Sequence, residues 1–462
     1  MTEKLIESLG EEVGVDLPDV RIRGVEPRLP SVFRVATAAA VSVGAVTAAV
    51  ARYGTRHEAP ERTPPEVSVD VRHAVAAFMS ERCFRIDGEK IGLWAPLSGD
   101  YRTSGGWVRL HCNFDHHREA VLRALGLPPD ADRDAVSRAC ESRTSVEIED
   151  AVIREGGCAA AMRSREEWLA HPQAETVAGT PLVALSRLDS AGPSPVGTAR
   201  AGGRPLDGVR VLDLSRVIAG PVAARILAAH GAEVLRVGAA HLPEVPGLVV
   251  ETAFGKRSCH IDLRAEADTL RELVRQADVV IQAYRPGSLA DRGFGPEGLA
   301  GLRPGVVCVE LSAYGSRGPW GRRRGFDSLV QMASGIAHEG GDGTRPFSLP
   351  CQALDHATGY LAAFGAVAGL LRRGDEGGSW RVELSLARTA RWLDGLGRTD
   401  RAEPAGGDPG LGVGDLLESV DSEFGRLTYV RPPGRIDGAE PYWASPPPRP
   451  GEHPAEWATA TG

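Results

Sequence analysis

Residues 206–237 read LDGVRVLDLSRVIAGPVAARILAAHGAEVLRV and predict a strand, a turn, a helix and a second strand. The apolar run Val209–Leu214 has the length and composition of a buried strand. The segment Val222–His230 is apolar on most faces, as expected of a buried helix, and Gly231 ends it. Ala232–Val237 then supplies the second strand.

The alternation of helices and strands continues beyond this unit. A helical pattern at Ala265–Gln276 precedes the apolar strand Asp278–Ala283, and a shorter one at Pro296–Leu302 precedes Val306–Leu311. Strands that alternate with helices indicate a parallel sheet covered on both faces. We therefore predict an α/β fold with a Rossmann-like parallel sheet over residues 206–394.

This predicted sheet lacks the signature of a dinucleotide-binding enzyme. The turn after the first strand reads SRVIAGP instead of GxGxxG. The second strand ends at Val237 and Gly238, without an acidic residue that could hold a ribose hydroxyl. A nicotinamide-dependent dehydrogenase is therefore disfavoured.

Composition and patterning divide the chain into several segments, and residues 30–189 alternate helical and strand-like pieces. We expect those residues to include a second, smaller α+β domain, and the tail to hold one short strand at Gly425–Val430. The predicted segments are a weakly patterned 1–29, the mixed 30–189, a Gly/Pro/Ser-rich linker 190–205, the Rossmann-like 206–394 and a Pro/Gly-rich tail 395–462.

The overall composition excludes several classes of protein. A net charge of -8 without a basic block argues against nucleic-acid binding. Seven cysteines without a CxxC pair argue against a disulfide framework or a zinc ribbon, and favour the reducing cytoplasm. The uncharged stretch Val35–Ala51 approaches the length of a membrane span, but we interpret it as a buried helix of a soluble domain, without membrane association.

One helix–strand pattern occurs twice. Residues 44–52 read GAVTAAVAR, and residues 365–373 read GAVAGLLRR. Each segment is followed by a polar loop and an alternating strand, VSVDV in the first copy and VELSL in the second. In this alignment Arg34 stands opposite Asp355, so only the second copy has an acid before its helix. Chance similarity between alanine-rich helices remains an alternative.

Asp355 directly precedes a helix that is apolar nearly all round. Asp is a good N-cap residue, so its carboxylate could bond the first turn of that helix. A carboxylate at a helix N-terminus is also favoured as the anion, and an anion can attack a thioester carbonyl. Both interpretations of Asp355 remain open from the local sequence.

Other charged clusters have structural and functional interpretations. Lys256 and Arg257 lie on an expected loop entering a strand, and Arg285 follows the carboxyl end of a strand, where open α/β sheets bind ligands. Arg322–Arg324 are expected on a solvated face. The run His111–His117 (HCNFDHH) has no standard metal-ligand spacing, so we predict no metal site.

These segments, taken in order, resemble the class III CoA-transferases, the family of formyl-CoA, carnitine-CoA and bile-acid-CoA transferases. The matching segments cover about 190 residues, and their order is more specific than any one of them. They are LDGVRVLDLSRVIAGPVAARILAAHGAEVLRV (206–237), GKRSCHIDL (255–263), ADVVIQAYRPGSL (277–289), LSAYGSRGPW (311–320), RRGFDSLVQMASG (323–335), ALDHATGY (353–360) and WRVELSLARTA (380–390).

The resemblance implies a CoA-transferase in which Asp355 is the nucleophile. Acyl-CoA would be a substrate, without a permanently bound cofactor, and a carboxylic acid would accept CoA after an aspartyl–acyl anhydride. It also implies a homodimer; the alternative is that one chain with two half-like segments supplies what two subunits normally provide. The implied CoA site consists of Ala219, Gly255, Lys256, Arg257, Ala283, Tyr284 and Arg285.

The chain departs from the family pattern in three ways. Sequence that resembles the family's smaller domain precedes residues 206–394. Residues 30–189 therefore resemble a second, degenerate half of the enzyme that lacks the catalytic aspartate. Gly238 replaces a common acid, and the arginine expected after the RPG turn is one place late, at Arg292. Phe326 stands where related 2-methylacyl-CoA racemases have histidine. The alternatives are therefore a non-catalytic CoA-binding or scaffolding homologue and a racemase.

Overall fold

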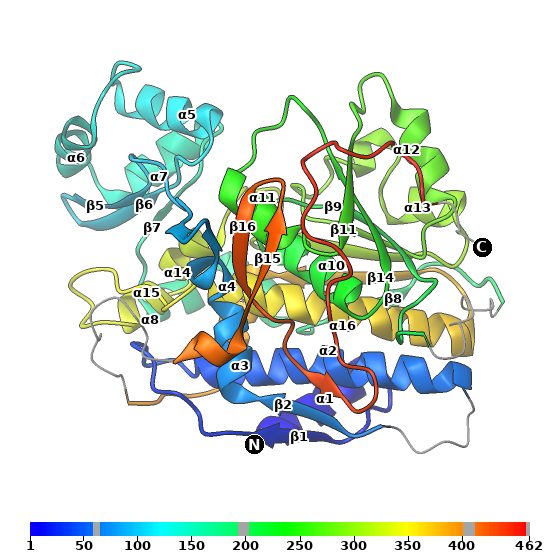
Figure 1. The fold of residues 1–462 in the computed structure, drawn as a ribbon. Helices are drawn as coiled ribbons and strands as arrows, with labels where there is room; N and C mark the ends of the chain where they lie inside the picture. The colour runs from blue at the N-terminus through cyan, green and yellow to red at the C-terminus, as the bar shows by residue number, and fades with distance from the viewer. Residues whose placement is uncertain (59–64, 193–202, 401–411, 459–462) are drawn as a thin grey trace.

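A seven-stranded sheet forms the centre of the molecule (Figure 1). The computed structural model describes residues 1–58, 65–192, 203–400 and 412–458. All neighbouring strands are parallel except the last pair. The strands, in spatial order, are β11 (Lys256–His260), β10 (Glu233–Gly238), β9 (Arg210–Leu214), β12 (Val279–Gln282), β13 (Val307–Ser312), β14 (Trp380–Ser385) and β8 (Ala184–Arg187).

The strand order confirms the predicted Rossmann-like α/β fold. Numbered from β9 to β14 along the chain, the six parallel strands have the spatial order 3-2-1-4-5-6. The direction of winding reverses between β9 and β12. Ligands of such sheets bind at this reversal, beyond the carboxyl ends of the strands.

Helices cover both faces of the sheet. Val211 of β9 joins the core on the side of α10 and α16, whereas the next residue, Leu212, joins the core on the side of α12 and α13. Two-sided burial explains why the strand sequences are almost wholly apolar. The helices of this part are α10 (Ala219–Ala229), α11 (Pro246–Thr252), α12 (Ala267–Val274), α13 (Pro296–Leu302), α14 (Asp327–Ala333), α15 (Ile336–Glu339), α16 (Ala353–Glu376) and α17 (Leu386–Gly395).

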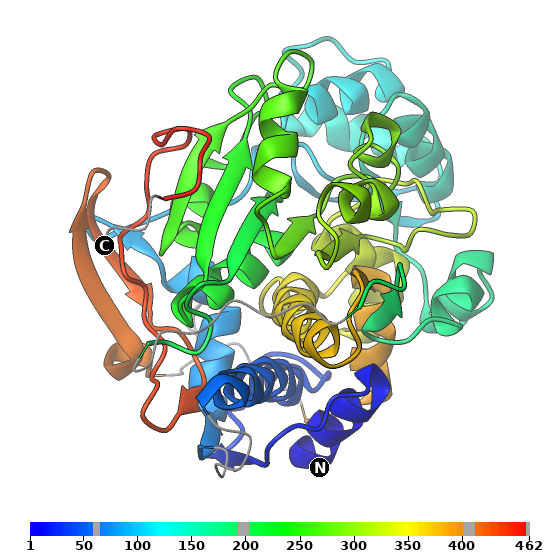
Figure 2. The ribbon, with the colours of Figure 1, turned by 90° about the vertical axis from the view of Figure 1, so that its right-hand side faces the viewer.

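A long helix from the N-terminal part, α2 (Val35–Glu58), lies along α16 (Figures 1 and 2). Its segment Val35–Thr55 is long and apolar enough to cross a membrane, but 94% of its most apolar window is buried inside the molecule. This packing confirms the prediction that Val35–Ala51 lies in a buried helix.

The structure confirms the repeated helix–strand pattern and extends it. The strand after α2, β2 (Val67–Asp70), pairs in parallel with β1 (Val20–Arg23) and antiparallel with β17 (Arg435–Ile436). The strand after α16, β14, likewise pairs in parallel with β13 and antiparallel with β8. A helix follows each strand directly, α3 (Val71–Phe78) after β2 and α17 after β14.

The N-terminal segment 1–29 is more ordered than its weak patterning suggested. Residues Thr2–Val13 form α1, which ends at Gly14 in the left-handed conformation. Ile6, Leu9 and Val13 are buried on one face of α1. Their spacing of three and four residues is helical, and it was overlooked because acidic residues surround it.

The predicted smaller α+β domain occupies residues 99–161 and has its own core. In Figures 1 and 2 it lies at one end of the sheet. Two short helices, α8 (Arg165–Leu169) and α9 (Pro172–Ala178), lead back to β8. Its elements are β5 (Gly99–Thr103), β6 (Gly106–Leu110), α5 (Asp115–Leu125), α6 (Arg133–Glu141), α7 (Ser145–Arg154) and β7 (Ala159–Ala161).

The C-terminal tail forms a small sheet with N-terminal residues. The predicted strand Gly425–Val430 is confirmed as β16. It pairs with β15 (Leu417–Ser422) on one side and with the hairpin of β3 (Arg85–Ile86) and β4 (Glu89–Lys90) on the other. Parts of the predicted linker and tail, residues 193–202, 401–411 and 459–462, lie outside the described residues.

Candidate active site

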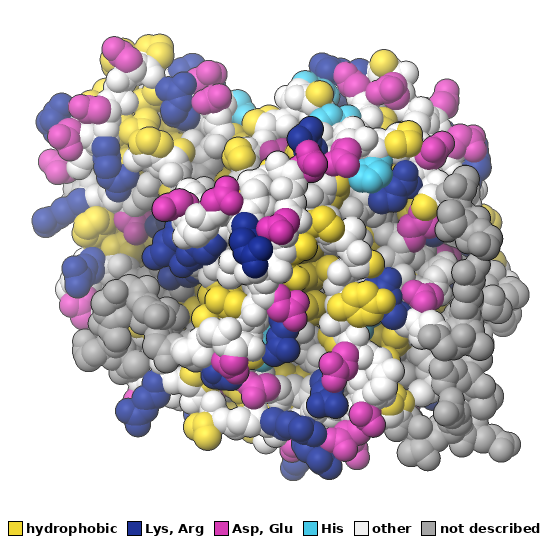
Figure 3. Space-filling model, in the orientation of Figure 1, with side chains coloured by type: hydrophobic (Ala, Val, Ile, Leu, Met, Phe, Trp, Pro, Cys, Tyr) yellow, Lys and Arg dark blue, Asp and Glu magenta, His cyan; other side chains and the backbone are white. Residues whose placement is uncertain are grey.

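A cavity of about 360 Å³ lies where the winding of the sheet reverses. The turn Leu214–Gly220 after β9 and the segment Ala283–Pro286 after β12 form one part of its wall. The start of α5, in the smaller domain, forms another part. In Figure 3 the molecule is hollowed at the top, between the smaller domain and the Rossmann-like part.

Asp355 lines this cavity from the first turn of α16. The helix begins at Ala353, after Gln352, so Asp355 is its third residue and not its N-cap. The N-cap interpretation of Asp355 was wrong. Leu354 is fully buried in the core, and its burial accompanies a helix start three residues earlier than the sequence suggested.

The carboxylate of Asp355 accepts no hydrogen bond from the described residues, although its side chain is only 8% exposed. Burial raises its pKa well above the ordinary value, and the carboxylates of Asp327 and Glu81 raise it further. The N-terminus of α16 acts in the opposite direction, because its N–H groups favour the anion. Asp355 is therefore a poorly solvated carboxyl group that is free to react.

Asp327 fixes the backbone at this position. It is the first residue of α14 and is fully buried, and its Oδ2 accepts the backbone N–H of Asp355 at 2.9 Å. Its Oδ1 accepts a hydrogen bond from Nε2 of Gln331 at 2.5 Å. Burial raises the pKa of Asp327 above its ordinary value, against these hydrogen bonds.

Gly359 allows α16 to reach the cavity. A Cβ atom at Gly359 would lie 2.6 Å from the carbonyl oxygen of Ala219, at the start of α10. Only glycine permits this close approach without a shift of the backbone. Gly359 thus brings Asp355 beside Ala219, a residue predicted to contact CoA, and both line the cavity.

The turn between β9 and α10 is strained beside the cavity. Val217 has φ of +73°, a conformation that is costly for a β-branched residue. Gly220 is required nearby, because a Cβ atom there would lie 2.3 Å from Ser215. The carboxylate of Asp213 accepts the backbone N–H of Ser215 at 3.0 Å and also its hydroxyl group, which fixes this turn.

Four arginines line the cavity region. Arg323 is paired with Glu149, and the other three have no carboxylate within 4 Å among the described residues. Arg216 follows β9, Arg285 follows β12, and Arg324 precedes α14. Arg216 lies over the ring of Phe114, and Arg324 donates to the carbonyl of Gly156 at 2.6 Å. Cations without a carboxylate partner are suited to bind an anionic ligand.

The predicted residues Ala283, Tyr284 and Arg285 all line this cavity. Tyr284 is half-buried, and burial raises its pKa. With Ala219 and Asp355, five of the eight residues predicted from the sequence therefore lie around one cavity.

The smaller domain contributes His116 and His117 to the cavity wall. Burial lowers the pKa of both, that of His117 to about 3, so both imidazoles are neutral at physiological pH. His111 stacks on Phe326 with ring centroids 3.6 Å apart. This contact packs the smaller domain against the segment before α14.

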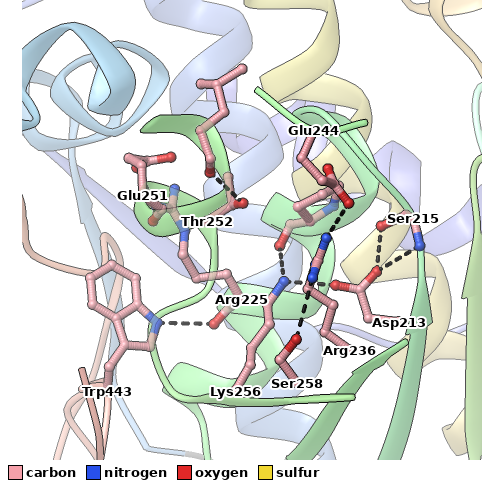
Figure 4. Close-up of polar contacts among 12 residues, drawn as sticks. Asp213, Ser215, Arg225, Arg236, Glu244, Glu251, Thr252, Lys256, Ser258 and Trp443 are labelled. Atoms are coloured by element: carbon pink, nitrogen blue, oxygen red, sulfur yellow. Dashed lines mark hydrogen bonds and ion pairs between the residues drawn. The ribbon is translucent and has the colours of Figure 1, made fainter. Parts of the chain in front are cut away.

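The structure does not place Lys256, Arg257 or Gly255 on the cavity. Lys256 is fully buried, and its Nζ donates to Asp213 at 2.7 Å and to the carbonyl of Pro221 at 2.9 Å (Figure 4). Burial lowers its pKa to about 8, against the raising effect of Asp213. The expectation of a cationic loop was wrong here, because Lys256 and Arg257 belong to β11.

Arg257 and Gly255 contact the C-terminal tail instead. Nη1 of Arg257 donates to the carbonyl of Glu456 at 2.7 Å. The backbone N–H of Gly255 donates to the carbonyl of Ser445 at 3.0 Å, and its φ of +70° favours glycine. Their arrangement gives these residues a structural part in holding the tail.

Sequence reasoning missed five residues that shape the site. Arg216 could have been found, because it directly follows the first strand of an open α/β sheet. Arg324 lies in a charge run that suggested solvent, and the two histidines lie in a cluster that suggested a metal. Asp327 carried no local signal. Within the described part of the chain, no group of three or more His, Cys, Asp or Glu is placed to hold a metal ion. The missed residues are His116, His117, Arg216, Arg324 and Asp327.

Comparison with known proteins identifies the part of the chain that carries this site. Residues 206–405 match the sequence profile of CoA-transferase family III. The chain is similar to that family over this region. The matched region contains Asp355 and the three arginines, but not the histidines of the smaller domain.

Individual relatives of the family III region are similar over different lengths. An acyl-CoA transferase of Gibberella moniliformis is 34% identical over 70% of this chain and 64% of its own length. A probable fatty acyl-CoA transferase of Mycobacterium tuberculosis is 35% identical over 40% of this chain and 50% of its own. The crystal structure of the mycobacterial protein superposes with a TM-score of 0.39 at 32% identity, covering 42% of this chain and 58% of that one. The chain thus spans less than two thirds of these relatives.

Proposed function

We propose that this protein transfers CoA from an acyl-CoA to a carboxylic acid, with Asp355 as the nucleophile. The proposal rests on one observation above all. Asp355 presents a carboxylate without a hydrogen-bond partner among the described residues, in the first turn of α16, to a cavity where three arginines lack carboxylate partners. A carboxylate that only stabilised the helix would be bonded to its N–H groups.

The reaction follows from the chemistry of a carboxylate and a thioester. A carboxylate oxygen of Asp355 attacks the thioester carbonyl, the C–S bond breaks, and CoA leaves as the thiolate. The thiolate attacks the aspartyl carbonyl of the anhydride, which releases the donor acid and leaves an aspartyl-CoA thioester. The acceptor carboxylate attacks that thioester, and the released thiolate takes the acceptor acyl group, which restores Asp355.

The substrates are proposed from the charge of the cavity and the names of the relatives. Arg216, Arg285 and Arg324 suit the phosphates of CoA or the carboxylate of the acceptor acid. Both relatives described above are named acyl-CoA transferases, which supports an acyl-CoA donor. Neutral His116 and His117 leave the arginines as the cations of the cavity wall.

Trapping the acyl-enzyme tests the proposal. The protein is incubated with a radiolabelled acyl-CoA and treated with hydroxylamine, and peptide mass spectrometry locates the resulting hydroxamate. We expect the hydroxamate on Asp355 in the wild type, with release of the labelled acid, and no hydroxamate at this position in Asp355→Asn. Turnover of acyl-CoA by Asp355→Asn at the wild-type rate would overturn the proposal. Binding of CoA without turnover by the wild type would favour the non-catalytic alternative.

A second candidate is racemisation of a 2-methylacyl-CoA, which needs two acid–base groups beside the α-carbon. The position that holds histidine in the racemases is Phe326 here, but His116 and His117 reach the same cavity from the smaller domain. Exchange of the α-proton of an acyl-CoA in deuterated water tests this reaction. Exchange without CoA transfer would favour the racemase over the transferase.

The proposal includes a homodimeric protein in the cytoplasm. The dimer rests on the family resemblance, and the cytoplasmic location is supported by cysteines that are scattered singly in the sequence without a CxxC pair. Light scattering after size-exclusion chromatography tests the dimer, which predicts twice the chain mass. Fractionation of cells tests the location.

A further inference from the structure

A carboxylate from the N-terminal part of the chain lies beside the first turn of α16. Glu81 belongs to the short helix α4 (Ser80–Cys83), which follows α3. Glu81 itself is only 3% exposed. An oxygen of Glu81 lies 2.9 Å from Nε2 of His356. His356 directly follows Asp355 and is completely buried.

The contact between Glu81 and His356 has a defined direction. The imidazole and the neighbouring positive charges lower the pKa of Glu81 against its burial, so Glu81 is an anion and Nε2–H of His356 donates to it. Nδ1 of His356 has no partner among the described residues. The hydrogen bond to Glu81 therefore orients this ring.

Packing from the same segment holds the ring from another side. The ring of Phe78, at the end of α3, stacks on His356 with centroids 5.6 Å apart and on Tyr360 with centroids 5.9 Å apart. His356 and Tyr360 are one turn apart on α16. The segment 78–81 thus packs against the first turn of the helix that carries Asp355 and restricts its movement.

Glu81 also acts on Asp355 through its charge. It is one of the two carboxylates, with Asp327, that raise the pKa of Asp355. Two other titratable groups face this cluster. Arg82 lies beside Glu81, and Cys351, whose thiol is buried, precedes α16. The nucleophile in the proposed reaction must be the anion, so its proton affinity controls the rate at low pH.

We infer that Glu81 is a positioning residue for Asp355, supplied by the N-terminal part of the chain, which lacks a corresponding aspartate of its own. Glu81 holds His356 and with it the first turn of α16, and it sets the proton affinity of the neighbouring carboxyl group. This inference rests on the proposed nucleophilic role of Asp355 and adds a residue to it.

The pH profile of the full-length enzyme tests the inference, with an acyl-CoA donor and a carboxylic acid acceptor. Glu81→Gln keeps the size of the side chain but removes its charge. We expect its acid limb to move toward lower pH by about 1 pH unit, because a like charge beside Asp355 is lost. We expect its maximal kcat to fall by up to about 10²-fold with little change in KM for acyl-CoA, because Asp355 is misplaced.

Two further variants separate charge from position. Glu81→Asp keeps the charge but shortens the side chain, so its acid limb should stay near that of the wild type while kcat falls. Glu251→Gln is the matched control, because Glu251 is an equally buried acid paired with Arg225. It should lower thermal stability without moving the acid limb.

Each outcome supports or overturns the inference. An unchanged acid limb and kcat in folded Glu81→Gln would overturn the role of Glu81 while leaving Asp355 as the nucleophile. A shift in Glu251→Gln as large as that in Glu81→Gln would also overturn it. A wild-type enzyme that forms no adduct on Asp355 would instead overturn the proposed function. If Glu81→Gln fails to fold, the acid limb of the pH profile of Glu81→Asp is the deciding measurement. A shift of that limb would contradict the claim that the charge of Glu81 sets the proton affinity of Asp355.

Discussion

The unit around α2 and the unit around α16 share one scaffold but differ at one helix start. Each has a 24-residue buried helix, a strand that follows it, and a short helix capped by the last strand residue, Asp70 or Ser385. In the first turn of α16, Asp355 faces a cavity, whereas the aligned residue, Arg34, directly precedes α2. The scaffold is therefore separable from the chemistry, which depends on the first turn and on its neighbours.

The two units also complete each other. The strand β8, which follows the smaller domain, closes the edge of the sheet at β14, and β17 from the C-terminal tail closes the edge at β2. In Figure 2, α2 and α16 lie next to each other between these elements. Because each edge strand comes from the chain segment beyond the other unit, we expect neither half to fold alone.

The largest expected effect is at the nucleophile. Asp355→Asn should lower kcat by at least about 10³-fold, since removal of a covalent nucleophile leaves only binding and positioning. Arg34→Asp should not restore activity to Asp355→Asn, because Arg34 does not line the cavity that Asp355 faces. Steady-state kinetics measures both, and activity regained in the double variant would break the distinction between the two units.

The second largest expected effect is on the KM for acyl-CoA, at the arginines that line the cavity faced by Asp355. Arg216→Ala, Arg285→Ala and Arg324→Ala should each raise KM for acyl-CoA by about tenfold, because a charge-assisted hydrogen bond contributes about 1.5–3 kcal/mol. Arg34→Ala is the control and should leave KM unchanged. An increase in KM for Arg34→Ala alone would contradict the prediction, because the anion site would then lie beside α2 and not beside α16.

Stability should distinguish the two helices as well. Gly359→Ala should lower the free energy of unfolding by about 1–3 kcal/mol, because its Cβ would meet the carbonyl of Ala219. The aligned change in α2 is the reverse one, Ala38→Gly, which should cost about 1 kcal/mol through helix propensity. Urea unfolding measures both, and a harmless Gly359→Ala would show that α16 can move away from α10.

The smallest expected effect is a pH dependence of stability. The pKa of Asp355 is raised in the folded protein, so its contribution to stability is complete below the unfolded value of 3.8 and is lost as pH rises through the folded pKa. The wild type should therefore lose more thermal stability between about pH 5 and about pH 8 than Asp355→Asn. Thermal melts measure the difference, and an equal or smaller loss in the wild type than in Asp355→Asn would contradict the burial of a free carboxyl group.

The fold could be read largely from periodicity. Strands such as Val209–Leu214 and helices such as Pro296–Leu302 were predicted within a few residues, because apolar runs and turn residues act locally. The helix α1 was missed although Ile6, Leu9 and Val13 carry its pattern. Local reasoning also placed Lys256 on a loop, because the pairing of β11 with β10 is not visible in its own sequence.

The sequence by itself determined the Rossmann-like sheet, the repeated helix–strand unit and Asp355 as the acid to examine. Only the tertiary structure decided that Asp355 is free and not a cap, that Lys256 is paired with Asp213, and that Glu81 reaches His356. The physical reason is distance along the chain. Burial and charge pairing depend on residues brought together from remote segments, whereas periodicity depends only on neighbours.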